Sequence, residues 1–180
     1  MDAYRLSLKL YFEHGASPEL TPYIAVFHRW IREHTLDHLL IDVADYSLVP
    51  EGPGIMLIGH EGHYSIDATD GLPGLVYAHK RPQDGSFAER LLASWQRLST
   101  AARLLEQEDS LAAAPRLARD RLAFRINDRL LAPNTTDTLA AVDPDLRSLL
   151  REIYGDAEVE LEHESDPRAC FGVQVRTALA

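Results

Sequence analysis

Short stretches in which apolar and polar residues alternate recur along this chain, and they constrain its fold more than any other feature. The clearest are 6–12, near the start, and 122–126, in the second half, where every second residue is apolar. A period of two predicts β-strands that bury one face. The segment 55–59, IMLIG, is apolar throughout, which predicts a strand inside a sheet. Further strands are expected at 39–43, 64–66, 75–77, 159–161 and 171–175.

Three segments between these strands have the spacing of amphipathic helices. Thr21 and Asp143 each precede a proline, which predicts helix starts at these two positions. Ser86 and Glu89 have the spacing of a capping box at the start of a long helix. The segment after that helix, 107–120, contains a proline and is the best candidate for a linker. Together these patterns predict an α+β fold, in which mixed or antiparallel sheets pack with about three helices.

The order of the expected elements is similar at the two ends of the chain. Residues 6–59 and residues 122–176 each predict strand, helix, strand, proline-containing turn and strand. We expect a single domain, and the order is compatible with two related halves, 1–80 and 116–180, joined by a helical connection over 86–114. In this hypothesis a β-α-β-β unit is duplicated about a pseudo-two-fold axis. The alternative is coincidence, because strands and helices alternate in many α+β domains.

Charge and composition exclude several classes of protein. The net charge is −10, from 28 acidic and 18 basic residues, whereas nucleic-acid binding relies on basic side chains that neutralise phosphates. The single cysteine, Cys170, excludes an intrachain disulfide or a paired-cysteine metal site. No stretch approaches the roughly 18 apolar residues that a transmembrane helix needs. We therefore expect a soluble cytoplasmic protein that binds neither nucleic acid nor a membrane.

The stretch 58–67, IGHEGHYSID, looks more like a catalytic or metal-binding motif than any other part of the chain. Its histidines, His60 and His63, are three residues apart, whereas the helical zinc-protease motif places two histidines four apart on one helix face. Strand-forming residues flank the stretch, and positions three apart on a strand point to opposite faces. The helical motif is therefore excluded, and the sequence predicts a turn at 59–62 between two strands.

A turn can bring these side chains together at the end of a sheet. His60, Glu61 and His63, with Asp42 from a neighbouring strand, are the candidate metal ligands, and Asp45 or Asp67 could supply a further carboxylate. Two imidazoles with carboxylates suit a divalent transition metal such as zinc, iron or manganese. In the alternative interpretation, Gly59 and the glycine at 62 supply unusual φ values for the turn, and the histidines are solvated or hydrogen-bonded to the backbone. A third possibility is a small ligand or anion that binds to the same loop without a metal.

Two function classes follow from these observations. The chain has no phosphate-binding P-loop, nucleophile elbow or dinucleotide fingerprint. We therefore expect a non-catalytic module that binds a ligand or another protein, or that assembles with itself as a homodimer. The predicted hairpin over 158–176 has an acidic face, which would suit a basic partner or confer solubility. The alternative is a metal-dependent enzyme with its site at the 60–63 turn.

Overall fold

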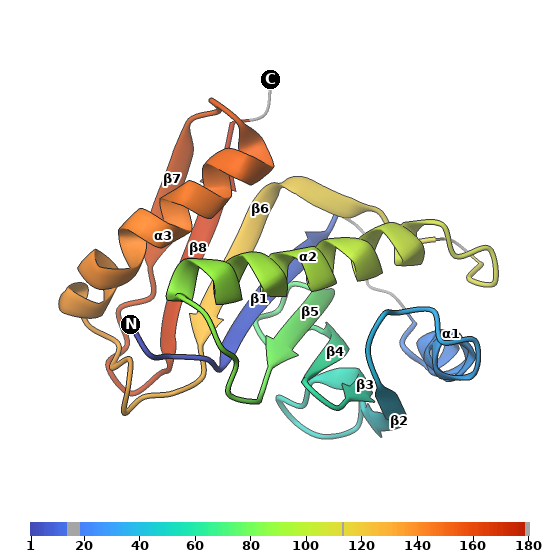
Figure 1. Ribbon diagram of the computed structural model, residues 1–180. Helices are drawn as coiled ribbons and strands as arrows, with labels where there is room; N and C mark the ends of the chain where they lie inside the picture. Colours follow the sequence, from blue (N-terminus) through green and yellow to red (C-terminus); the bar gives the residue numbers. More distant parts are fainter. Residues whose placement is uncertain (14–18, 113, 179–180) are drawn as a thin grey trace.

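The computed structural model describes residues 1–13, 19–112 and 114–178, which form one antiparallel sheet and three helices (Figure 1). The strands are β1 (Leu6–Phe12), β2 (Leu40–Tyr46), β3 (Gly54–Gly59), β4 (Gly62–Asp67), β5 (Gly74–His79), β6 (Leu117–Ile126), β7 (Val159–His163) and β8 (Phe171–Thr177). The helices are α1 (Thr21–Arg32), α2 (Phe87–Glu106) and α3 (Thr136–Tyr154). The predicted α+β class is confirmed. None of the described helices is long and apolar enough to cross a membrane.

The eight strands lie in the order β2-β3-β4-β5-β1-β6-β8-β7, and every neighbouring pair is antiparallel. The first strand of the chain, β1, lies in the middle of the sheet between β5 and β6. The two edges are β2 and β7. Residues that lie directly opposite each other in such a sheet point to the same face, so each row of partners belongs to one face.

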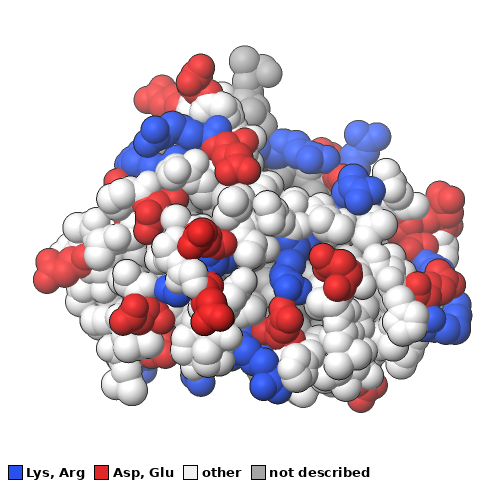
Figure 2. Space-filling view, in the orientation of Figure 1, with Lys and Arg blue, Asp and Glu red and all other residues white. Residues whose placement is uncertain are grey.

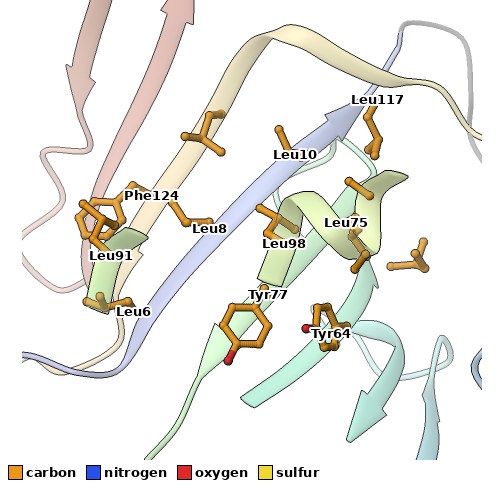
Figure 3. Packing of buried hydrophobic residues seen from close by; sticks show 14 of the residues in the cluster. Leu6, Leu8, Leu10, Tyr64, Leu75, Tyr77, Leu91, Leu98, Leu117 and Phe124 are labelled. Carbon is orange, nitrogen blue, oxygen red and sulfur yellow. The ribbon is translucent and has the colours of Figure 1, made fainter. Parts of the chain in front are cut away.

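All three helices contribute to a single core on one face of the sheet, which we call the helix face. In Figure 1, α2 and α3 cross in front of the strands, and α1 lies beside β2 and β3. Figure 3 shows side chains of β1, such as Leu6 and Leu8, meeting Leu91 and Leu98 of α2. These four side chains are fully buried. Burial of each contributes roughly 1.5–3 kcal/mol to folding.

No described helix packs on the opposite face of the sheet, which we call the open face. One row of partners there runs Ser65, Val76, Lys9, Ala123 and Gln174, across β4, β5, β1, β6 and β8. Small and polar side chains therefore occupy positions where the helix face carries leucine and aromatic residues. Several of them are still buried; Lys9, for example, has only 6% of its surface exposed.

Two predicted helix starts and the predicted linker differ from the structure. Thr21 is the first residue of α1, and the N-cap Leu20 makes no side-chain capping bond. Helix α3 begins at Thr136, capped by the Thr135 hydroxyl, so that Pro144 lies inside the helix instead of at its start. The predicted linker 107–120 is too long, because its last four residues belong to β6. The capping box of Ser86 and Glu89 at the start of α2 is confirmed.

The two predicted halves contribute strands to the same sheet. Both β1 and β6 are followed by a helix and then by an edge strand. The chain then returns to β1 through β3, β4 and β5, but it returns to β6 through β8 alone. This order of elements does not establish a duplication, which stays a hypothesis.

Candidate functional site

The GHEGH stretch forms the tight turn between β3 and β4, as its glycines and flanking residues predict. The turn consists of His60 and Glu61, and three neighbouring segments hold it. The His60 amide donates to the carbonyl of Leu39, before β2, at 2.8 Å. The Glu61 carbonyl accepts from the amide of Lys80, after β5, and its carboxylate pairs with Arg97 of α2 at 2.5 Å. The turn is thus a fixed part of the sheet.

The glycines on either side of this turn allow close packing, and their φ angles are not unusual. Neither Gly59 nor Gly62 has a positive φ. A Cβ atom at Gly62 would lie 2.6 Å from the Tyr77 hydroxyl and 2.8 Å from the Ala78 carbonyl. A Cβ atom at Gly59 would lie 2.5 Å from the carbonyl of Gly62. The expectation that these glycines supply φ values is therefore wrong; they leave room for the neighbouring strand and ring.

Below the turn, on the helix face, lies a Tyr–His cluster of Tyr64, Tyr77, His38 and His79. The rings of Tyr64 and Tyr77, which Figure 3 shows side by side, have centroids 4.9 Å apart. The Tyr64 hydroxyl lies 3.3 Å from His38 Nε2, and the Tyr77 hydroxyl lies 3.1 Å from His79 Nδ1. Asp37 holds the other nitrogen of His38 at 3.0 Å. This chain of contacts resembles an acid–base relay in its residue types.

Burial argues that the Tyr–His cluster is structural. Both tyrosines have no exposed surface, so neither hydroxyl can meet a substrate. Burial raises the pKa of Tyr77 to about 12 and raises that of Tyr64 further, so both stay protonated at neutral pH. Burial also lowers the pKa of His79, which favours the neutral ring. The two tyrosine hydroxyls therefore belong to the core below the turn and do not face solvent.

The four predicted metal ligands lie in different surroundings in the structure. His60 is exposed in the turn, and Glu61 is paired with Arg97. His63 points to the open face, on the row that passes through Ile58 to Asp42. Asp42 is exposed, and its carboxylate accepts from the Val43 amide. In the described part of the chain no group of three or more His, Cys, Asp or Glu side chains could hold a metal ion. That these residues bind a metal stays a prediction.

The open face carries a cavity of about 300 Å³, which we call the polar groove. Its walls come from β1, β3, β4, β5 and β6 and from the loop between β4 and β5. Met56, Val76 and Ala78 supply an apolar floor, whereas Lys9 and His63 are among the polar residues of its walls. Cavities of this size, with a few polar groups that converge on an apolar floor, are typical of small-ligand sites.

A buried lysine organises one end of the polar groove. Lys9 Nζ donates to Asp67 Oδ1 at 3.1 Å and to Asp70 Oδ1 at 2.6 Å. The Lys9 and Asp67 side chains are almost completely buried, at 8% and 13% exposure. Asp67 also accepts from the amide and hydroxyl of Thr69, which shapes the β4–β5 loop over the open face. Burial acts to raise the pKa of Asp70, but the hydrogen bond and charge of Lys9 outweigh it and hold that pKa below its usual range.

The polar contacts continue from Asp70 across the open face to β8. The Tyr11 hydroxyl lies 3.0 Å from Asp70 Oδ2 and 2.8 Å from the Gln174 side-chain oxygen. The Gln174 amide donates to Glu164 at 2.9 Å, and Arg125 donates to the same carboxylate at 2.8 Å. Burial raises the pKa of Tyr11, so its hydroxyl keeps its proton. Each cation named on this face is thus paired with at least one carboxylate.

Of the four candidate metal ligands His60, Glu61, His63 and Asp42, only His63 lines the polar groove. Its Nδ1 atom is buried and has no hydrogen-bond partner among the described residues. Burial, assisted by the charge of Lys80, lowers the pKa of His63, so the ring is neutral near pH 7. A buried polar atom of this kind requires a partner such as a water molecule or a ligand.

Sequence reasoning named His63 and Asp67, but it missed Lys9 and Asp70 and the grouping of Asp67 with them. Lys9 lies on the polar side of an alternating strand, a position that normally faces solvent. The available signal was the succession of carboxylates at the end of β4, in DATD, close to a turn. Comparison with protein-family models, with curated proteins and with solved structures found no match to this chain.

Proposed function

We propose that this chain is a non-catalytic ligand-binding module whose binding site is the polar groove on the open face. The observation that carries this proposal is the groove itself, a cavity of about 300 Å³ with polar walls on a sheet face that no described helix covers. The Tyr–His cluster, which has the residue types of catalysis, is buried on the other face and offers no access to a substrate.

The charges of the polar groove indicate an uncharged ligand. Each of these cations is already paired: Lys9 with the two carboxylates of Asp67 and Asp70, and Arg125 with that of Glu164. A charged ligand would have to displace one of these pairs and leave a partner uncompensated. Uncharged side chains with hydrogen-bonding capacity also line the groove, among them Ser7, Ser65 and His63. A small, uncharged polar molecule with an apolar side would match both the walls and the floor.

A thermal-shift screen followed by calorimetry tests this proposal. The panel contains uncharged polyols, sugars and amides, each beside a charged analogue of similar size. A ligand that binds only the folded chain raises its Tm as its concentration rises. We expect stabilisation by an uncharged class and none by the charged analogues.

Filling the polar groove provides the matched comparison. Val76→Trp places a large ring on the floor of the groove, whereas Ala140→Trp adds the same ring at an exposed position of α3. Binding should be lost in the first variant and retained in the second. The proposal fails if no uncharged class binds, or if Val76→Trp binds as well as the wild type.

Self-association is a second candidate function, supported by a separate observation. Five large apolar side chains are exposed in and around the edge strand β2: Leu39, Ile41, Tyr46, Leu48 and Val49. The backbone edge itself is protected, because the Asp42 carboxylate accepts from the Val43 amide and the register shifts between residues 40 and 42. A contact between two copies would therefore use these side chains and not a continuous sheet.

Sedimentation analysis over a range of concentrations tests self-association. Leu48 is 96% exposed, and Leu48→Asp should abolish a dimer that buries this surface. Leu130→Asp is the control, because Leu130 is equally exposed but lies in the loop before α3. A wild-type chain that stays monomeric at high concentration rules this candidate out.

The metal-dependent alternative is decided by metal analysis of the purified protein and of a His60→Ala/His63→Ala double variant. Stoichiometric metal that is lost in the double variant would establish it. A wild-type protein that stays free of zinc, iron and manganese after loading would exclude it.

A further inference from the structure

A second and larger cavity, of about 560 Å³, lies on the helix face, on the other side of the sheet from the polar groove. It lies between the second half of α2, the end of α3 and the start of β6. Figure 1 shows these three segments converging on the upper part of the molecule. The cavity shares no lining residue with the polar groove, so what it binds is independent of the function proposed above.

The deeper wall of this helix-side cavity is apolar. Leu10 and Leu117 form part of the sheet beneath it, and both are buried. Trp95 of α2 and Ile153 of α3 line it from the helices and are only partly buried. Apolar side chains that stay partly exposed inside a concave site gain free energy when a ligand removes them from water.

The polar groups of the cavity carry an excess of positive charge. Glu106 accepts from Arg119 at 2.9 Å and from the Leu117 amide at 3.0 Å, so its charge is compensated. Arg103 also lines the cavity, and it makes no hydrogen bond or ion pair with any residue that the structure describes. One guanidinium is thus available to a ligand. Figure 2 shows Lys and Arg side chains along the upper edge of the helix face, with Asp and Glu side chains between them.

Tyr154 provides a neutral hydrogen-bond donor in the same cavity. Its hydroxyl makes no hydrogen bond within the described part of the chain. Burial raises the pKa of Tyr154 to about 12, with a contribution from the nearby Asp120 carboxylate, so the hydroxyl keeps its proton at neutral pH. Asp120 itself does not line the cavity. A protonated hydroxyl and an unpaired guanidinium are the donors that a carboxylate accepts from.

We propose that the helix-side cavity binds an amphipathic carboxylate, with its apolar body against Trp95 and Ile153 and its carboxylate at Arg103 and Tyr154. A medium-chain fatty acid or an arylalkyl carboxylate has this chemistry. The volume of the cavity is within the range of sites that enclose small organic ligands. The compensated Glu106 does not repel such a head group.

Calorimetric titration of the full chain with decanoate, below the concentration at which it forms micelles, tests this proposal. We expect saturable binding of one decanoate per chain, accompanied by a change in tryptophan fluorescence, because Trp95 lines the cavity. Decanol, which has the same chain but no charge, should bind at least about tenfold more weakly, because a charge-assisted hydrogen bond to the head group is lost. Decyltrimethylammonium, with the opposite charge, should not bind.

Three variants separate a specific site from general adsorption. Arg103→Gln should weaken decanoate binding about tenfold and leave decanol binding unchanged. Arg151→Gln, at an exposed arginine in the last turn of α3 that does not line the cavity, should have no effect. Ser99→Trp, which places a ring at the wall of the cavity, should abolish binding of both molecules. The proposal is overturned if decanoate does not bind, if decanol binds as tightly, or if Arg151→Gln weakens binding as much as Arg103→Gln.

Discussion

At the scale of single residues, Gly62 shows how closely the β3–β4 turn packs on the next strand. We expect Gly62→Ala to destabilise the fold by roughly 1–3 kcal/mol, because the added methyl group overlaps the Tyr77 hydroxyl and the Ala78 carbonyl. The backbone carbonyl cannot move without disturbing the β4–β5 pairing. Urea denaturation measures the free energy of unfolding of both proteins.

Gly71 is the matched comparison for this variant. It has a φ of +79° but no atom within 4 Å of an added Cβ. Gly71→Ala should therefore lose only about 1 kcal/mol, from the left-handed backbone conformation. If Gly62→Ala is as stable as the wild type, the close approach of Tyr77 does not restrict this position.

Lys9 is the residue on which the ion pairs of the polar groove depend. Lys9→Met leaves Asp67 and Asp70 without their cation, and we expect a loss of roughly 3–5 kcal/mol at pH 7. Lys80→Met, at a lysine with no ion pair among the described residues, should change stability little. Equal stability of Lys9→Met and the wild type would show that the attraction within the ion pairs does not exceed the free-energy cost of burying their charges.

The loss of stability caused by Lys9→Met should depend on pH, and the direction of this dependence follows from the pKa of Asp70. The pKa of Asp70 is lowered in the folded state, mainly by Lys9 acting against burial. Its contribution to stability is therefore complete above the unfolded pKa of about 3.9 and is lost as the pH falls through the folded pKa. The difference in unfolding free energy between the wild type and Lys9→Met should shrink below about pH 4. A difference that stays constant from pH 7 to pH 3 would contradict this assignment.

At the scale of secondary-structure elements, α3 contains a proline in its interior, where proline destabilises a helix. Pro144 lies in the ninth position of the helix, so it cannot donate to the carbonyl of Ala140. We expect Pro144→Ala to raise the unfolding free energy by about 1–3 kcal/mol, because it restores that hydrogen bond and removes the ring clash. Denaturation followed by circular dichroism measures the change.

Pro82, in the exposed connection before α2, gives the opposite expectation. Pro82→Ala should lower stability slightly, by about 0.4–1 kcal/mol, because the unfolded chain gains freedom. If Pro144→Ala also destabilises the chain, α3 must gain more from the rigidity of its proline than it loses in hydrogen bonding.

Local patterns were sufficient for most elements but not for the start of α3 or for the polar groove. Ser86 with Glu89, and the alternation of β1, are signals contained in a few neighbouring residues. Asp143 before Pro144 is the same kind of signal, and it predicted the wrong start because the helix already begins at Thr136, where the Thr135 hydroxyl caps it, and buries Val142 before it reaches Asp143. The groove joins residues such as Lys9 and Asp70, 61 positions apart, and their contact depends on strand order and register. A local pattern of residues predicts neither the strand order nor the register.

At the scale of the whole molecule, the position of β1 makes the two ends of the chain interdependent. β1 pairs with β5 on one side and with β6 on the other, and its leucines belong to the same core as α2. A half such as 1–80 or 116–180 would expose a central strand edge and lose the helix that covers both. The polar groove has the same dependence, since its walls come from β4 and β5 as well as from β6.

We therefore predict that the interior strands of both ends unfold in one cooperative transition. Native-state hydrogen exchange should give the same opening free energy for Tyr64 in β4, Leu8 in β1 and Val173 in β8, because all three amides belong to interior strands of one sheet. Amides of the edge strands β2 and β7 should exchange at lower free energies, since edge strands fray. If Val173 opens at a free energy well below that of Tyr64, the second half unfolds by itself. The sheet would then consist of two units that meet between β1 and β6, as the hypothesis of related halves requires.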